Sequence, residues 1–222
     1  MQARAFLGIW HNLQAGTERD FDRWHTYEHM PERVGVPGFR VARRYMNWQL
    51  ASHVCFTMYE GAHLETFRSP GYLARLNDPT PWSRRVGATQ TDFVRGAFEV
   101  DTSLGSGVGG ALGTFRISFS EGERESGLQI LRPACQDLRD LHGVVSVHLG
   151  VAKQEITGVR TKEMEIRPST TAENAVDTVV LLETIGLEEL QAILGEAEDC
   201  LRVSAAAAIV AEPYRLAYLL EA

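Results

Sequence analysis

The fold of this chain is decided by one short stretch. It reads Phe21-Asp-Arg-Trp-His-Thr-Tyr-Glu-His29-Met-Pro31 and runs through Val36-Pro-Gly-Phe39 into Arg40-Val-Ala-Arg-Arg-Tyr45. Apolar residues three and four apart predict a helix over residues 18–34, which begins after the cap Thr17. Pro-Gly then marks a turn, and the residues after it predict a strand over 39–48. Because titratable groups on the apolar side of a helix are costly to bury, this stretch is also the candidate site.

The same order of elements is predicted twice along the chain. The first copy has strands at 3–13, 39–48, 53–60 and 92–100 and helices at 18–34 and 62–76. The second has strands at 112–119, 144–154, 177–184 and 214–220 and helices at 126–141 and 187–201. The local sequence agrees, since Phe6-Leu-Gly-Ile-Trp10 aligns with Ala111-Leu-Gly-Thr-Phe115. An internal repeat of this kind fixes the architecture before any motif does.

Each copy reads strand–helix–strand–strand–helix–strand, which is the order of a ferredoxin-like unit. Both faces of its sheet are apolar, so each sheet needs a second cover, and the simplest cover is the sheet of the other copy. We therefore predict an α+β protein in which two tandem ferredoxin-like units form an intramolecular dimeric α+β barrel. Residues 1–103 form the first repeat, the glycine-rich residues 104–111 link the two, and residues 112–222 form the second. The alternative is two independent domains, each pairing with another molecule.

Composition narrows the possible partners. The 222 residues are 44% hydrophobic and 23% charged with a net charge of −7, and no basic stripe indicates nucleic acid as a partner. The three cysteines are far apart and form no Cys-x-x-Cys pair, which is typical of a reducing compartment. No signal peptide is indicated, and the apolar run 205–210 is too short to span a bilayer. The expectation is a soluble cytoplasmic protein with no membrane or nucleic-acid partner.

The opening stretch resembles one known family. The spacing Phe21-x-x-Trp24-His25-x-x-x-His29-x-Pro31, then Pro37-Gly38-Phe39 and Arg43-Arg44-Tyr45, is similar to that of the EthD-like group of dimeric α+β barrel proteins. The resemblance covers residues 3–48 and implies a pocket between sheet and helices. Related families include muconolactone-type isomerases, polyketide cyclases, cofactor-free monooxygenases and haem-binding proteins, so the fold does not fix the reaction. This chain has His25 where the family has an aromatic residue.

His29 is the first catalytic candidate, because a neutral imidazole can take a proton from carbon or oxygen near pH 7. Without the resemblance, a capping or core histidine is the plainer interpretation. Tyr27, His11 or an arginine would polarise a substrate oxygen. Arg43 and Arg44 point to opposite sheet faces, so one of them faces the pocket, and Arg43 is taken as that residue.

The predicted pocket wall is aromatic. It consists of Phe21, Trp24 and His25 on the helix, with Trp82 as a lid from the proline-rich loop 79–85. The alternative for Trp82 is burial against the second helix.

His25 and His29 are four residues apart and can reach one metal ion, with His11 as a third ligand. The string His25-Thr-Tyr-Glu-His29 also matches a metalloprotease motif. A short helix that ends at Pro31 does not provide the scaffold of such enzymes, so we predict no metal. In the second copy Ala134 and Gln129 stand where His29 and Trp24 stand in the first, which predicts one site per chain.

These observations predict a small-molecule enzyme without an organic cofactor. It would act on an aromatic or polyketide-like compound by isomerase, cyclase or lyase chemistry, with His29 as general acid and base. The alternatives are a haem- or metal-dependent oxidoreductase or monooxygenase on the same fold, and a ligand-binding protein without turnover. The chain would be a monomeric pseudo-dimer or a homo-oligomer. Residues 155–175 form a long loop that either reaches over the first half or is mobile.

Overall fold

The computed structural model describes residues 3–157, 160–167, 176–202 and 206–222. Its strands are hydrogen-bonded in the order β1-β3-β2-β8-β5-β7-β6-β4, which is the order of a closed barrel. The predicted α+β class and the tandem ferredoxin-like repeat are therefore confirmed. By their contacts the residues form two compact units, each described by itself below.

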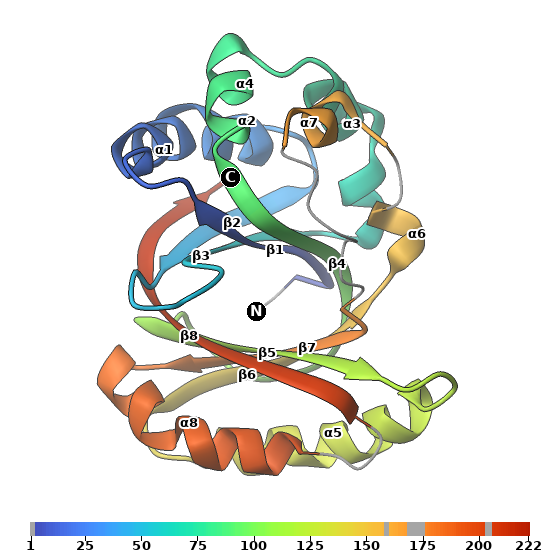
Figure 1. Ribbon diagram of the computed structural model, residues 1–222. Helices are drawn as coiled ribbons and strands as arrows, with labels where there is room; N and C mark the ends of the chain where they lie inside the picture. Colours follow the sequence, from blue (N-terminus) through green and yellow to red (C-terminus); the bar gives the residue numbers. More distant parts are fainter. Residues whose placement is uncertain (1–2, 158–159, 168–175, 203–205) are drawn as a thin grey trace. The chain divides into compact units, whose positions relative to one another are not determined.

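The first unit is built on an antiparallel sheet. β3 (Cys55–Gly61) pairs on one side with β1 (Ala5–Leu13) and on the other with β2 (Phe39–Met46). The helical elements lie on one face of this sheet (Figure 1). They are α1 (Glu18–Trp24), η1 (His25–His29), α2 (Met30–Val34), η2 (Leu64–Arg68), α3 (Pro70–Asn77) and α4 (Pro81–Gly87).

The turn before β2 requires glycine. Gly38 has φ of +99°, a left-handed conformation that residues with a Cβ rarely adopt, and a Cβ there would lie 2.8 Å from Thr66 Oγ1. The Pro-Gly turn predicted from the sequence thus fixes where the helix ends and where β2, the strand that carries Arg43 and Arg44, begins.

The second unit repeats the plan. β7 (Thr178–Thr184) pairs with β5 (Ala111–Phe119) and β6 (Val144–Ala152), while β8 (Ala206–Glu221) adds to β5. The C-terminal part of β4 (Gln90–Gly105) adds to β6. Helices α5 (Arg124–Arg139) and α8 (Leu187–Leu201) cover one face of this sheet and bury a leucine- and valine-rich core (Figure 1).

One segment of the second half groups with the first. α6 (Gln154–Thr157) and α7 (Lys162–Ile166) follow β6 in sequence, yet residues 153–157 and 160–167 belong to the unit of residues 3–97. Residues 217–222, at the end of β8, belong to it as well. The halves of the sequence and the compact units therefore do not coincide at these places. Of the long loop predicted at 155–175, residues 158–159 and 168–175 lie outside the described part.

Several element boundaries differ from the prediction. The helix expected over 62–76 is instead the 3-10 turn η2 followed by α3, because Pro70 cannot continue a helix but suits a first turn. Residues 81–87, expected to be loop, form α4, whose cap Thr80 accepts from Ser83 N. β4 extends through Gly105 and β8 starts at Ala206, so both strands are longer than predicted.

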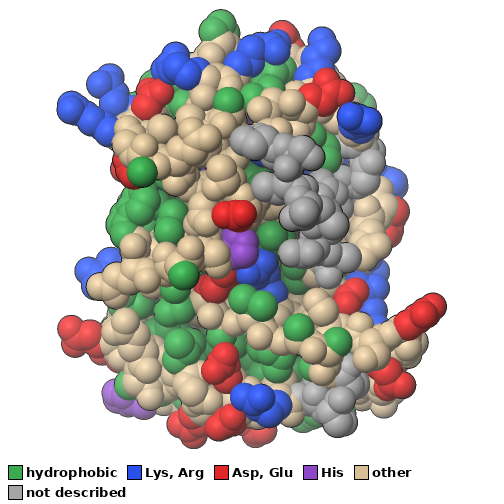
Figure 2. Space-filling model, viewed as in Figure 1, with side chains coloured by type: hydrophobic (Ala, Val, Ile, Leu, Met, Phe, Trp, Pro, Cys, Tyr) green, Lys and Arg blue, Asp and Glu red, His purple; other side chains and the backbone are tan. Residues whose placement is uncertain are grey.

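Acidic and basic side chains are interspersed over the face drawn in Figure 2, which shows no extended basic surface. This agrees with the net charge of −7. No helix in the described part of the chain has the length and apolar character needed to cross a membrane.

Candidate functional site

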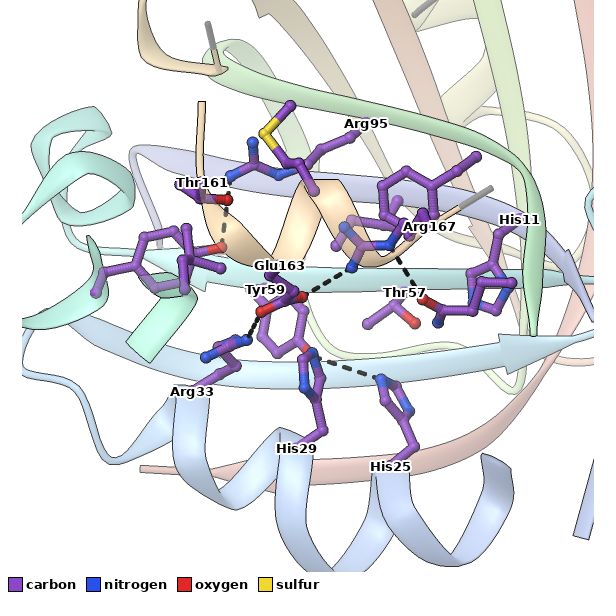
Figure 3. Close-up of a pocket in the computed structure, with 16 residues that line it drawn as sticks. His11, His25, His29, Arg33, Thr57, Tyr59, Arg95, Thr161, Glu163 and Arg167 are labelled. Atoms are coloured by element: carbon purple, nitrogen blue, oxygen red, sulfur yellow. Dashed lines mark hydrogen bonds and ion pairs between the residues drawn. The ribbon is translucent and has the colours of Figure 1, made fainter. Parts of the chain in front are cut away.

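The candidate site is a small cavity of about 30 Å³ inside the first unit. Histidines, arginines and one carboxylate line it together with aromatic residues: His11, His25, His29, Arg33, Arg95, Arg167, Glu163, Tyr59, Tyr72 and Phe93 are among its walls (Figure 3). Space of this size holds about one or two water molecules.

The helix that carries the two histidines is irregular at the site. Residues 18–34 run as one helical stretch, but η1 is a π-helical turn between α1 and α2. Such turns are rare and often lie at functional sites. Figure 3 shows His25, His29 and Arg33 pointing from this helix toward the sheet and α7. Tyr27 does not join them: its side chain is 73% exposed.

His29 is held in an apolar, closed environment. Its ring lies 4.2 Å from that of Trp24 between centroids, and its Nδ1 is buried without a hydrogen-bond partner among the described residues. Burial, with added repulsion from Arg33 and Arg167, holds the pKa of His29 well below its ordinary value. His29 is therefore neutral at pH 7, as a general base must be.

His25 is engaged through both ring nitrogens. Nδ1 lies 3.4 Å from Arg44 Nη1, and Nε2 lies 3.5 Å from the Tyr59 hydroxyl. Its ring stacks on Phe21 with centroids 5.0 Å apart. Burial, followed by repulsion from His29 and Arg44, lowers the pKa of His25 well below its ordinary value. The imidazole of His25 thus stacks as an aromatic ring would and also contacts Tyr59.

The third histidine enters from the sheet. His11 on β1 is buried, and its Nδ1 lies 3.0 Å from the carbonyl oxygen of Asn12. Burial lowers its pKa to about 4, so this imidazole is neutral as well. Its ring packs against Phe21 and Phe93. The pocket thus contains neutral imidazoles from both of its opposing layers.

α7 supplies the charged part of the wall. Glu163 forms ion pairs with Arg33 and, at 2.8 Å, with Arg167. Burial alone would raise the pKa of Glu163, but the two arginines outweigh it and lower the pKa below its ordinary value. The guanidinium of Arg167 also lies 3.9 Å from the centroid of the Phe93 ring and donates to Gln90 Oε1 at 3.2 Å. Arg95 donates to the Tyr72 hydroxyl at 3.4 Å.

Two predicted site residues lie elsewhere in the unit. Arg43 is buried but pairs with Glu60 and does not line the cavity, whereas Arg44 is the arginine that reaches the helix and contacts His25. Trp82 does not line the cavity either: it lies on α4 and donates to Asp20 Oδ1 at 3.0 Å. Side-chain alternation separates Arg43 from Arg44 without saying which of them faces the helix, so the sequence alone does not decide between the two.

Phe21 and Trp24 form a layer behind the histidines. Both are buried, and Trp24 donates to Ser83 Oγ at 3.1 Å. Neither lines the cavity itself. They contact His25 and His29 respectively and so fix the orientation of the imidazoles.

A metal site on His25 and His29 does not fit this geometry. The two rings are nearly parallel, at 23° and 5.5 Å between centroids, so they stack instead of directing nitrogen atoms at one point. No group of three histidine, cysteine or acidic residues in the described part of the chain is arranged to hold a metal ion.

Sequence reasoning missed most of the polar wall. Arg33 follows His29 by four residues on the same helix, and Thr57 and Tyr59 share one face of β3, so helical spacing and strand alternation contain the signal for these three. Glu163 and Arg167 carry no such signal, because nothing local connects them to the first half of the chain.

Comparison with known proteins supports the fold and leaves the family open. No family model matches the chain, and no curated protein matches it. Solved structures do match. An anthrone oxidase-like protein superposes with a TM-score of 0.68 at 10% identity, over 98% of this chain and 92% of that one.

Two further solved structures are similar over nearly their whole length. A putative monooxygenase from Lactobacillus acidophilus has a TM-score of 0.60 at 6% identity and covers 99% and 97% of the two chains. A putative monooxygenase from Fusobacterium nucleatum has a TM-score of 0.58 at 10% identity and covers 100% and 96%. At such identities the likeness establishes the shared ferredoxin-like barrel fold and nothing finer.

Proposed function

We propose that this chain is a small-molecule enzyme that removes a proton from an enolisable aromatic or polyketide-like compound, with His29 as the base. The observation that carries the proposal is the state of His29, a buried, neutral imidazole in the cavity wall whose Nδ1 has no partner among the described residues. A buried polar atom without a partner is unfavourable unless a ligand or water meets it.

The surrounding residues suit the charge that such a step creates. When the imidazole takes the proton from carbon, the electron pair moves to the substrate's carbonyl oxygen and forms an enolate or phenolate. Arg33, Arg95 and Arg167 line the same cavity and would stabilise that oxyanion. His11 and Tyr59 are further hydrogen-bonding groups within reach of the site.

The same first step serves two kinds of reaction. Return of the proton to another carbon gives an isomerisation or cyclisation, whereas reaction of the carbanion with O₂ gives an oxygenation without a cofactor. The resemblance to EthD-like proteins and the likeness to an anthrone oxidase-like protein are compatible with either outcome.

Deuterium exchange tests the proposal directly. The protein is incubated in D₂O with anthrone, whose C10–H becomes an aromatic anthrolate on deprotonation, and loss of the C10 proton signal is followed by NMR under nitrogen. Wild type should accelerate exchange, and H29Q should lose about 10²–10⁴-fold, the usual contribution of a general base. His63 is exposed in the same unit and gives the matched control H63Q, which should behave as wild type.

The variants also distinguish a binding protein from an enzyme. Exchange in H29Q at the wild-type rate, with an unchanged circular dichroism spectrum, would remove His29 from the mechanism. Absence of exchange in wild type, across anthrone and simple enolisable naphthols, would favour the alternative of a ligand-binding protein without turnover.

A further inference from the structure

The charges around the cavity do not balance. Among the described residues three arginines line it against one carboxylate, that of Glu163; a second carboxylate outside the lining, that of Glu32, pairs with Arg33 at 3.3 Å. The three histidines add no charge, since burial lowers the pKa of each. Within the described residues the pocket wall therefore carries an excess of positive charge, which favours an anionic occupant.

Glu163 occupies the position that such an anion would take. It reaches the cavity from α7, and its two oxygens bind different guanidinium groups, Oε2 with Arg33 and Oε1 with Arg167 (Figure 3). Planar guanidinium groups recognise carboxylates by this kind of hydrogen-bonding. Arg95 in the same wall has a neutral partner, the Tyr72 hydroxyl, and no carboxylate within ion-pair distance among the described residues.

The cavity is too small to hold a ligand while Glu163 is in its present position. The cavity of about 30 Å³ holds water only, whereas a pocket for a drug-sized ligand measures about 300–1,000 Å³. α7 and its two caps contribute four cavity walls, Thr161, Glu163, Met164 and Arg167, so a movement of this segment would enlarge the cavity. Polar contacts hold this short helix at three points: the pair with Arg33, the bond from Arg167 to Gln90, and a 3.2 Å bond from Lys162 N to Asn77 Oδ1.

A second unpartnered atom belongs to the α7 segment. Thr161 Oγ1 is buried and has no hydrogen-bond partner among the described residues, as is the case for His29 Nδ1 across the pocket. Unpartnered polar atoms on two walls of the pocket are available to hydrogen-bond to one occupant.

We infer that the pocket takes a substrate bearing a carboxylate, and that Glu163 is an internal carboxylate that holds the arginines until the substrate's own carboxylate replaces it on Arg33. This deepens the proposed function, on which it rests for the identity of the site. The substrate class is then an aromatic or polyketide-like acid, held by Arg33 and Arg95 with its enolisable carbon beside His29.

Binding of two matched probes tests this inference. 9-Anthracenecarboxylate and its neutral carboxamide differ only in the anionic group, and the fluorescence of both can be titrated with the purified full-length protein. Wild type should prefer the carboxylate, and R33Q should weaken carboxylate binding by about 10–100-fold while changing carboxamide binding little.

The decisive variant is E163Q. Once the internal carboxylate no longer competes, 9-anthracenecarboxylate should bind about tenfold more tightly than to wild type, because the competent form is more populated. Glu165 lies on the same helix, is exposed and pairs with the exposed Arg160, so E165Q makes the same change of charge outside the cavity lining and should bind as wild type. Equal or weaker carboxylate binding by folded E163Q would overturn the inference.

Two measurements keep the test independent of folding and of catalysis. If E163Q does not fold, the wild-type preference for carboxylate over carboxamide decides alone, and equal affinity for the two probes overturns the inference. Titration of H29Q separates the two proposals. If H29Q still prefers the carboxylate and exchanges at the wild-type rate, His29 is refuted as the base but the acid-binding site is not. If carboxylate preference and exchange are lost together only in R33Q, neither proposal is refuted.

Discussion

Trp24 covers one face of His29 at 4.2 Å between ring centroids and is itself fixed by a 3.1 Å hydrogen bond to Ser83. An indole in this position excludes water from the imidazole, and exclusion of water is the largest cause of the lowered pKa of His29. The aromatic residue one turn before the histidine thus sets the protonation state of the candidate base.

The first prediction concerns the pH dependence of proton exchange. A general base acts only when it is neutral, so the rate is lost as pH falls through the pKa of His29 in the folded protein. Because that pKa lies well below the ordinary histidine value of about 6.5, exchange should be independent of pH from about 8 down to about 6.5. The measurement is the anthrone exchange rate against pH. A rate that halves near pH 6.5 would show an imidazole in contact with water.

The second prediction is that the free energy of unfolding, like the exchange rate, decreases as pH falls, and that it does so over a wide pH range. His11 has a pKa of about 4 when folded and about 6.5 when unfolded. The unfolded state therefore binds more protons between these values, and stability that is present above pH 6.5 is lost as pH falls toward 4. His11 alone contributes on the order of 3 kcal/mol to this loss. Urea unfolding at pH 7.5 and 4.5 measures it.

The variant H11Q isolates that contribution. Its unfolding free energy should fall less than that of wild type over the same pH interval, because one titrating group is gone, although it starts from a lower stability. H63Q changes an exposed histidine and should keep the full wild-type dependence. Parallel curves for H11Q and wild type would mean that His11 is hydrated in the folded protein.

The features of this protein that could be predicted from its sequence are those that depend on local patterns. The helix over 18–34, the Pro-Gly turn and the repeat depend on neighbouring residues, and all three are present as predicted. Tyr27 fails as a pocket residue for an equally local reason: it lies two positions from each histidine, and residues so spaced on a helix do not face one another.

The charged wall could not be predicted in this way. Glu163 meets Arg33 across 130 residues of sequence, and no periodicity relates α7 to the helix it contacts. The sequence contains a hint only in the spacing of Glu163 and Arg167, which puts both on one side of a helical turn. Which distant surface this turn meets is decided by the tertiary fold.

A third prediction addresses Trp82, which the sequence suggested as a lid. Its indole donates to Asp20 and packs beside Phe21, Trp24 and Val86, away from the cavity walls. W82F should therefore lower the unfolding free energy by about 0.5–1.5 kcal/mol through the lost hydrogen bond. Its anthrone exchange rate should equal that of wild type. A large loss of exchange in W82F without loss of stability would contradict this prediction and show that Trp82 contributes to the pocket.

The last prediction concerns Arg43, the arginine that the sequence placed in the chemistry. It forms a buried ion pair with Glu60 between neighbouring strands. R43M leaves the carboxylate of Glu60 buried without this charge partner and should lower the unfolding free energy by about 3–5 kcal/mol. The double variant R43M/E60M removes both charges and should recover most of that loss, since apolar replacement of a buried pair is often neutral.

A double-mutant cycle in urea measures this coupling, with R43M, E60M and the double variant compared at pH 7.5. The double variant should also retain the wild-type exchange rate, because neither residue lines the cavity. If the double variant is stable but no longer exchanges the C10 proton of anthrone, then Arg43 acts on the substrate after all. In that event Arg44, which contacts His25 from the adjacent position on the strand, would be the structural arginine of the two.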